Sequence, residues 1–324
     1  MLSRNAQGLY WMGRYLERAQ HGCHLLAEQF IIIEDRPVEQ IDQSWRRLFM
    51  ALGRTPLGGH LDPLPDDEDF MLADAYTLAD DLTFEPTNPD AIRNCVAAAR
   101  ESARQVRNII PDKMWSSLNL AYFDLRDVEM EAIWNNQPGS FYDLTEGAIR
   151  TVSGVAEGTI YRDDGWHFLQ LGRFVERAQL IAALMNAHIA LFPTAAPDCE
   201  ADWLSLLWIC EAHFAYRRLY SLELRPPRMV DFLVADPSLS HSIRHSLGRI
   251  VEALAAVASG PPLRIEAERR AGRMAASIDH DWPDRDREDD DATRKALQEF
   301  GASCRLLHDD IAAAYFNYEI KDAP

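Results

Sequence analysis

Apolar residues recur at alternating steps of three and four along almost the whole chain, and this spacing limits the fold more than any other feature. Six residues show it near the start: Met12, Leu16, Ala19, Cys23, Leu26 and Phe30. Such residues form one stripe along an α-helix, whereas a half-buried β-strand needs strict alternation, which no segment sustains. The sequence therefore predicts an all-α protein, with a first helix over about residues 3–34 and Ser3 at its N-cap.

A second apolar stripe repeats the first, displaced by the same number of residues at every position. Its members are Leu171, Val175, Ala178, Ala182, Met185 and Ile189. The neighbouring letters agree as well, because GRYLERAQ at residues 13–20 matches GRFVERAQ at residues 172–179. This agreement over both pattern and identity indicates an internal duplication.

The duplication continues, in order, through later parts of the chain. Trp45 corresponds to Trp203, and the pair Ile92-Arg93 corresponds to Ile243-Arg244, where a third helix is expected to begin in each copy. The sequence thus predicts a single domain over residues 1–324, a helical bundle made of two pseudo-symmetric repeated helical units. Repeat 1 covers about residues 1–150, and repeat 2 covers about residues 160–324.

The copies differ in their connections. A Gly, Pro and Asp-rich loop at 54–69 has no counterpart, and the first copy continues into a helix over 115–134. In the second copy we expect a solvated acidic linker at 279–291 and a final helix over 292–320.

Charge and composition exclude several classes of function. The formal net charge of -18 disfavours binding to nucleic acid, and no apolar stretch approaches the length needed to span a bilayer. The start of the chain lacks the features of a signal peptide, and the five cysteines are scattered without a CxxC pair. We therefore expect a cytoplasmic protein that binds neither nucleic acid nor membranes.

Each copy carries an Arg-x-x-Glu-Arg motif, whose spacing places three charged side chains on one side of a helix. The motifs comprise Arg14, Glu17 and Arg18 in the first copy and Arg173, Glu176 and Arg177 in the second. In the second copy the same side continues as Leu180 and Leu184, which predicts that this helix is enclosed.

Two interpretations of the motifs remain open. Enclosed charges persist when they are paired, so the glutamate of each motif is expected to bind the arginines of the other motif in a reciprocal network. Alternatively, the motifs line a cleft for a cationic or zwitterionic ligand, with the arginines as binding residues and Glu17 and Glu176 as candidate acid and base.

A row of arginines on the third helix of the first copy is a further candidate ligand site. Arg93, Arg100, Arg104 and Arg107 lie within a narrow arc of that helix. Guanidinium groups bind carboxylates and phosphates, so a carboxylate or phosphate site is one interpretation, and pairing with acidic helices of the same chain is the other.

Four possible metal ligands occupy consecutive turns of the first helix: Glu17, His21, His24 and Glu28. The second copy has leucine or alanine at the last three positions, and the chain has no Glu-x-x-His signature. His241 and His245 are interpreted as two residues of one helix face. We therefore predict no metal site and no cofactor, with the histidines as surface residues.

Several segments together resemble the bacterial alpha-E domain family over essentially the whole chain. They are the opening MLSRNAQGLYWMGRYLERAQ, the paired GRxxERA motifs, residues 99–107 and residues 165–173. Gln20 and Ser102 depart from the family pattern, which has Glu and Asn there. The resemblance implies an all-helical domain encoded beside, or fused to, a circularly permuted ATP-grasp protein, with a transglutaminase-like peptidase as a possible second partner.

These neighbours imply amide-bond or peptide chemistry. We expect an accessory or substrate-presenting helical subunit that works with an ATP-grasp ligase. The alternatives are a stand-alone hydrolase or transferase, with Glu17 and Glu176 in a cleft between the repeats, and a structural scaffold without a ligand. The surroundings of the two glutamates distinguish these three functions. A polar cleft around both glutamates favours an enzyme or a binding protein, and a sealed ion-pair network favours a scaffold.

Overall fold

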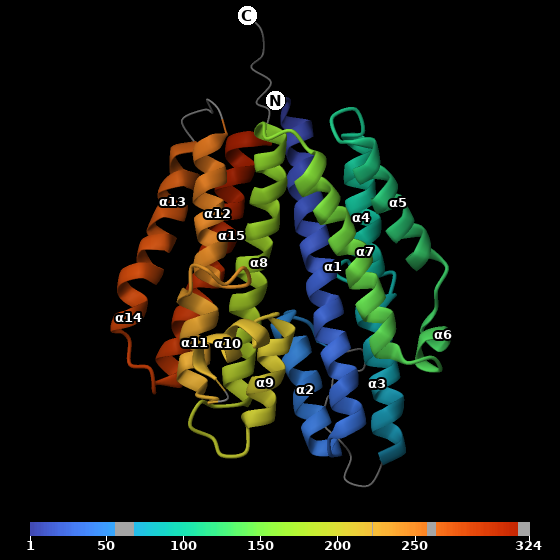
Figure 1. The fold of residues 1–324 in the computed structure, drawn as a ribbon, viewed down its shortest axis with the longest axis vertical. Coiled ribbons are helices and arrows are strands. Elements are labelled where there is room, and N and C mark those ends of the chain that lie inside the picture. Colours follow the sequence, from blue (N-terminus) through green and yellow to red (C-terminus); the bar gives the residue numbers. More distant parts are fainter. Residues whose placement is uncertain (56–67, 222, 258–263, 317–324) are drawn as a thin grey trace, which may run out of the picture.

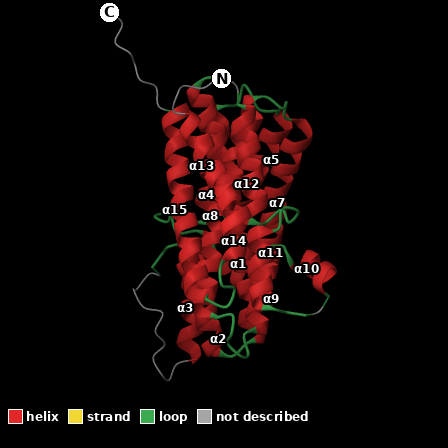
Figure 2. Cartoon of the chain, turned by 90° about the vertical axis from the view of Figure 1, so that its left-hand side faces the viewer, coloured by secondary structure: helices red, strands yellow, loops and turns green. Residues whose placement is uncertain are grey.

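The computed structural model describes residues 1–55, 68–221, 223–257 and 264–316, and every regular element within these ranges is helical (Figures 1 and 2). The predicted all-α class is therefore confirmed. The helices of the first part are α1 (Ser3–Asp35), α2 (Val38–Ala51), α3 (Glu68–Thr83), α4 (Ile92–Gln105), α5 (Asp112–Arg126), α6 (Met130–Trp134) and α7 (Pro138–Thr159). Those of the second part are α8 (Asp164–Leu191), α9 (Glu200–Ile209), α10 (His213–Tyr220), α11 (Pro226–Ala235), α12 (Ile243–Ala256), α13 (Arg264–Ala276), a π-helix η1 (Ser277–Asp281), α14 (Trp282–Asp284) and α15 (Asp290–Tyr315).

Two long helices, α1 and α8, pack against each other in the middle of the molecule (Figure 1). On one side α1 packs against α4 and α7, and α5 covers both of these helices. On the other side α8 packs against α12 and α15, and α13 covers both. Two short helices connect the part around α1 with the part around α8, because α2 packs on α8 and α9 packs on α1.

The apolar stripes predicted on the two central helices form the core. All twelve of their members are buried, from Met12 to Phe30 in α1 and from Leu171 to Ile189 in α8. Leu180 and Leu184, on another side of α8, are buried as well, which confirms that this helix is enclosed. Among the described residues, no helix is both long and apolar enough to cross a membrane.

Glycines allow the backbones of α1 and α8 to touch. A Cβ atom on Gly172 would lie 1.9 Å from the carbonyl oxygen of Tyr10, and one on Gly13 would lie 2.3 Å from that of Leu169. Any larger side chain would push the helices apart. The glycine of each GRxxERA motif therefore sets the distance at which the charged residues of the two motifs face each other.

Three local predictions were wrong. Ser3 is the first helical residue rather than the N-cap, because the extended residue before α1 is Leu2. The helix expected over 115–134 is two helices, α5 and α6, interrupted at residues 127–129. The linker at 279–291 is partly helical, and Trp282 within it is buried with its indole nitrogen donating to Asp231 at 3.1 Å.

Two predictions fall partly outside the described residues. The loop at 54–69 is described only at its ends, and α3 begins at Glu68. The final helix is described to Tyr315, and residues 317–320 of its predicted range lie beyond the description.

Candidate functional site

The two motifs face each other where α1 crosses α8, and each glutamate binds two arginines of the other helix. Glu176 on α8 accepts a hydrogen bond from Arg14 Nε on one oxygen at 2.5 Å and from Arg18 Nε on the other at 2.7 Å. Arg14 and Glu176 are both buried, and Arg18 is also paired with Asp90. This half of the network is closed around its carboxylate.

Glu17 on α1 makes the reciprocal contacts. Arg177 binds both of its oxygens, with Nη2 at 2.8 Å from Oε2, and Arg173 Nε donates to the same Oε2 at 3.1 Å. Arg177 additionally donates to the backbone carbonyl of Ser240 at 3.2 Å. The structure therefore contains the reciprocal network that the sequence indicated, with both arginines of each motif engaged.

Both glutamates are negatively charged in this setting. Burial alone would raise the pKa of Glu17, but the charges of Arg177 and Arg173 outweigh it and lower the pKa to about 2. Burial also opposes ionisation of Glu176, yet Arg14 and Arg18 lower its pKa below the ordinary value. Two ionised carboxylates and four guanidinium groups thus form a compact cluster, and Asp90 adds a third negative charge beside Arg18.

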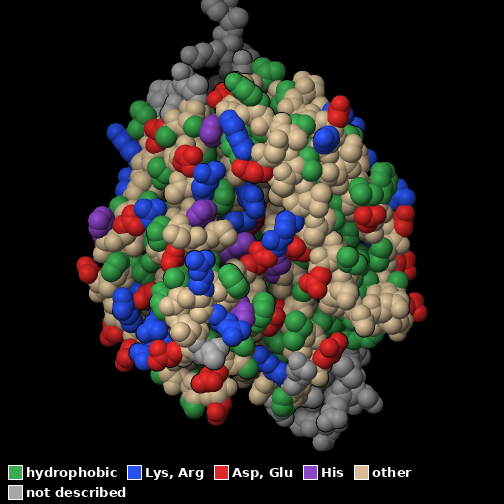
Figure 3. Space-filling model, viewed as in Figure 1, with side chains coloured by type: hydrophobic (Ala, Val, Ile, Leu, Met, Phe, Trp, Pro, Cys, Tyr) green, Lys and Arg blue, Asp and Glu red, His purple; other side chains and the backbone are tan. Residues whose placement is uncertain are grey.

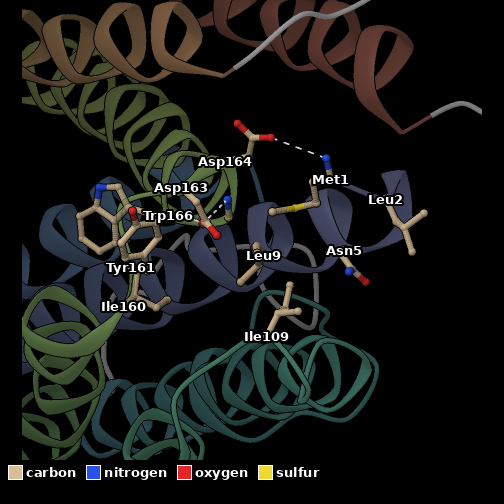
Figure 4. Close-up of a pocket in the computed structure, with 11 residues that line it drawn as sticks. Met1, Leu2, Asn5, Leu9, Ile109, Ile160, Tyr161, Asp163, Asp164 and Trp166 are labelled. Carbon is tan, nitrogen blue, oxygen red and sulfur yellow. Dashed lines mark hydrogen bonds and ion pairs between the residues drawn. The ribbon is translucent and has the colours of Figure 1, made fainter.

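Two small cavities adjoin Glu17. One of about 20 Å³ lies between Glu17, Arg173 and the helix α7, and another of about 10 Å³ lies between Glu17, Arg177 and His241. Each has room for about one water molecule. A larger cavity of about 320 Å³ lies at the N-terminal end of α1, near the start of α8. The residues that line it include Asn5, Ile109 and Trp166 (Figure 4).

The arginine row on α4 does not converge on this site. Arg100 donates to the side chain of Asn119 at 2.5 Å and lies over the ring of Tyr122 at 4.6 Å. Arg104 pairs with Glu101 on its own helix, and Arg107 pairs with Asp112. Arg93 donates to the backbone carbonyls of Phe84 and Val128, so only Arg104 and Arg107 have the acidic partners that the second interpretation requires. The role of the row in ligand binding stays a prediction.

The histidines do not lie on the surface as expected. His21 and His24 are half-buried, and the ring nitrogen Nε2 of each is buried without a hydrogen-bond partner. His241 precedes α12 in a turn instead of sharing a helix face with His245. Burial lowers the pKa of His21 to about 4, so this ring is neutral at physiological pH. The spacing of these histidines in the sequence did not predict their burial, because helices from other parts of the chain cover them.

The fold and the site define an all-helical protein in which two central helices are joined by reciprocal arginine–glutamate ion pairs. Residues 1–316 match the Alpha-E family, described as "a predicted alpha-helical domain with a conserved ER motif". This chain therefore belongs to the Alpha-E family. It contains two Glu-Arg pairs, Glu17-Arg18 and Glu176-Arg177, and both are part of the network.

Related proteins of known sequence occur in mycobacteria. Uncharacterized proteins of Mycobacterium bovis and Mycobacterium tuberculosis are 24% identical to this chain in an alignment of 263 residues that covers 75% of the chain. The matched region spans only 28% of the length of those relatives. No solved structure matches the chain.

Proposed function

We propose that this chain is an accessory helical module that works with an ATP-grasp ligase in amide-bond or peptide metabolism. The closed geometry of the paired motifs carries the proposal. Guanidinium donors occupy both oxygens of Glu17 and of Glu176, so the motifs fix α1 against α8 and leave the bond-forming chemistry to a partner.

The size of the relatives supports a modular role. Because the matched region is 28% of their length, it is joined there to a long additional sequence. The resemblance described above makes an ATP-grasp ligase the expected partner, and a transglutaminase-like peptidase a second one. A rigid helical module beside such a ligase would hold or present the substrate.

A stand-alone hydrolase or transferase fits this geometry less well. A general base or acid works best when its pKa lies near the operating pH. The pKa of Glu17 is about 2, and that of Glu176 is also below the ordinary value, so neither carboxyl exchanges a proton readily at neutral pH. A scaffold without a ligand would use the same ion pairs, and binding experiments separate it from the accessory module.

We also infer that the two groups of helices derive from one repeated unit. Support comes from corresponding contacts: α4 and α7 pack on α1 with α5 against both, and α12 and α15 pack on α8 with α13 against both. The helices α4 and α12, which the sequence match paired, begin at Ile92 and Ile243 as expected, but α3 and α9 to α11 precede them, so neither is the third helix of its part. The reciprocal ion pairs are those expected of a two-fold relation between the repeats.

Co-purification and turnover test the functional proposal. The chain would be expressed with and without an ATP-grasp protein encoded beside it, and ATP hydrolysis would be measured with amino acids and short peptides as acceptors. We expect the two proteins to co-elute, the ligase to lose turnover without this chain, and the chain alone to hydrolyse no ATP. Equal ligase turnover without the chain would refute the accessory role.

A further inference from the structure

A second cluster of ionisable side chains lies two helical turns along α1 from Glu17. It brings together His24 on α1, Glu146 on α7 and Glu211 in the turn between α9 and α10. His24 Nε2 is 3.5 Å from Glu146 Oε1 and 3.8 Å from Glu211 Oε1. The ligand atoms of all three residues lie within 4.8 Å of one another.

These separations resemble those between ligands of one metal ion. With metal–ligand bonds of about 2.1 Å, the donor atoms of a tetrahedral zinc site lie about 3.4 Å apart. Nε2 of His24 is buried, and its nearest polar neighbours are two carboxylate oxygens at 3.5 and 3.8 Å, which are too distant for a good hydrogen bond. A buried ring nitrogen without a good hydrogen bond is available to coordinate a metal ion.

A second imidazole adjoins the cluster. His241 Nε2 is 3.7 Å from the other oxygen of Glu211, and its ring lies edge-on to that of His24 with centroids 6.3 Å apart. Glu211 has a φ of 50°, a backbone conformation that is unfavourable for a non-glycine residue and that occurs often at functional sites. On the face shown in Figure 3, histidine, acidic and basic side chains lie close together near the centre.

The two carboxylates of this cluster already bind one cationic group, the guanidinium of Arg150. Arg150 pairs with both carboxylates, with Nη2 at 2.5 Å from Glu146 Oε1. Its side chain is 53% exposed, so it can turn into solvent when a divalent ion takes its place. Gln20 donates to Glu146 at 2.8 Å and would keep that carboxylate oriented.

We propose that His24, Glu146 and Glu211, with His241 beside them, bind one divalent transition-metal ion of the zinc or iron class. Imidazole nitrogens favour these ions over magnesium and calcium, which prefer oxygen ligands. Glu211, with 30% of its side chain exposed, gives the ion a route from solvent. The site is independent of the accessory function, and it departs from the sequence-based expectation that the chain has no metal.

Calorimetric titration of the full chain with Zn²⁺, after dialysis against a chelator, tests the proposal. We expect one ion per chain, and affinity at least about tenfold weaker in His24→Gln and in Glu211→Gln. His280→Gln, at an exposed histidine of η1, is the matched control and should bind Zn²⁺ like the wild type. Circular dichroism and melting temperature confirm that each variant folds.

Arg150→Gln gives a test that misfolding cannot imitate. Removal of the competing guanidinium should tighten Zn²⁺ binding by about threefold, because partly exposed ion pairs are weak. The proposal is overturned if the chelated wild type binds no Zn²⁺, if His24→Gln and His280→Gln bind it equally, or if Mg²⁺ binds as tightly as Zn²⁺.

Discussion

Replacement of Glu176 by glutamine should destabilise the fold by about 3 kcal/mol. Glutamine keeps the shape of the side chain but removes the negative charge that two guanidinium groups share. Arg14 is only 5% exposed and loses the carboxylate that it binds, whereas Arg18 keeps Asp90. Removing one partner of a buried ion pair costs about 3–5 kcal/mol, and the remaining contact of Arg18 places the loss at the lower end.

The same substitution at Glu17 should cost a similar amount, and its pKa supplies a second estimate. The pKa falls from an ordinary value of 4.5 to about 2, and each pKa unit corresponds to about 1.4 kcal/mol. The ionised form of the fully enclosed Glu17 therefore contributes about 3 kcal/mol to stability at neutral pH. Arg177 would be left as the buried, unneutralised cation.

Denaturant unfolding at pH 7, followed by far-ultraviolet circular dichroism, measures both losses. A change of about 3 kcal/mol is a large share of the 5–15 kcal/mol typical of folded domains. The control is Glu157→Gln, which makes the same change at a surface ion pair with Arg162, where the glutamate is 59% exposed. We expect it to stay within about 0.5 kcal/mol of the wild type.

The outcome that refutes this reasoning is a stability within about 0.5 kcal/mol of the wild type for Glu17→Gln and Glu176→Gln alike. The arginines would then be solvated by water or neutralised by an anionic ligand, and the motifs would line an open cleft. Loss of stability at Glu176 alone would limit the structural role to that half of the network.

The remaining predictions concern the loss of stability in acid, the contact between α1 and α8, and the reactivity of the cysteines. Because the folded pKa of Glu17 is depressed, its contribution should be complete above about pH 4.5 and lost as the pH falls toward 2, so the stability gap between wild type and Glu17→Gln should close in that window. Gly13→Ala and Gly172→Ala should each lower the unfolding free energy by about 1–3 kcal/mol or more, whereas Gly154→Ala, with open space around it, should raise it by up to about 1 kcal/mol. A thiol reagent should modify half-buried Cys199 in the native chain and the other four cysteines only after unfolding.

Sequence periodicity predicted the central helices well because α1 and α8 bury one continuous stripe each. It also located the starts of α4 and α12, where turn residues precede the first apolar position. The break after α5 was missed, since residues 127–129 contain no glycine or proline to announce it. Ser3 was misplaced by one residue because a residue type alone locates a helix end only to within one or two positions.

The candidate site was only partly predictable. The paired motifs indicated the ion pairs because two identically spaced motifs, on helices that face each other, place each glutamate against the arginines of the other motif. The His24 cluster was not indicated, because its other members come from α7, from the turn after α9 and from the turn before α12. No spacing rule links residues so far apart. A search along α1 alone groups His24 with Glu17, His21 and Glu28 instead.

The two clusters are physically continuous, and this continuity suggests why the ion pairs are closed. Arg177 binds Glu17 and also the carbonyl oxygen of Ser240, the residue before His241. His24 lies seven residues after Glu17 on the same side of α1, so the ion pair fixes both imidazoles relative to each other. A ligand site needs groups held to within about half an ångström, which a rigid buried network can provide. The paired motifs thus act as the support of the neighbouring cluster, and any ligand chemistry of this chain is expected there.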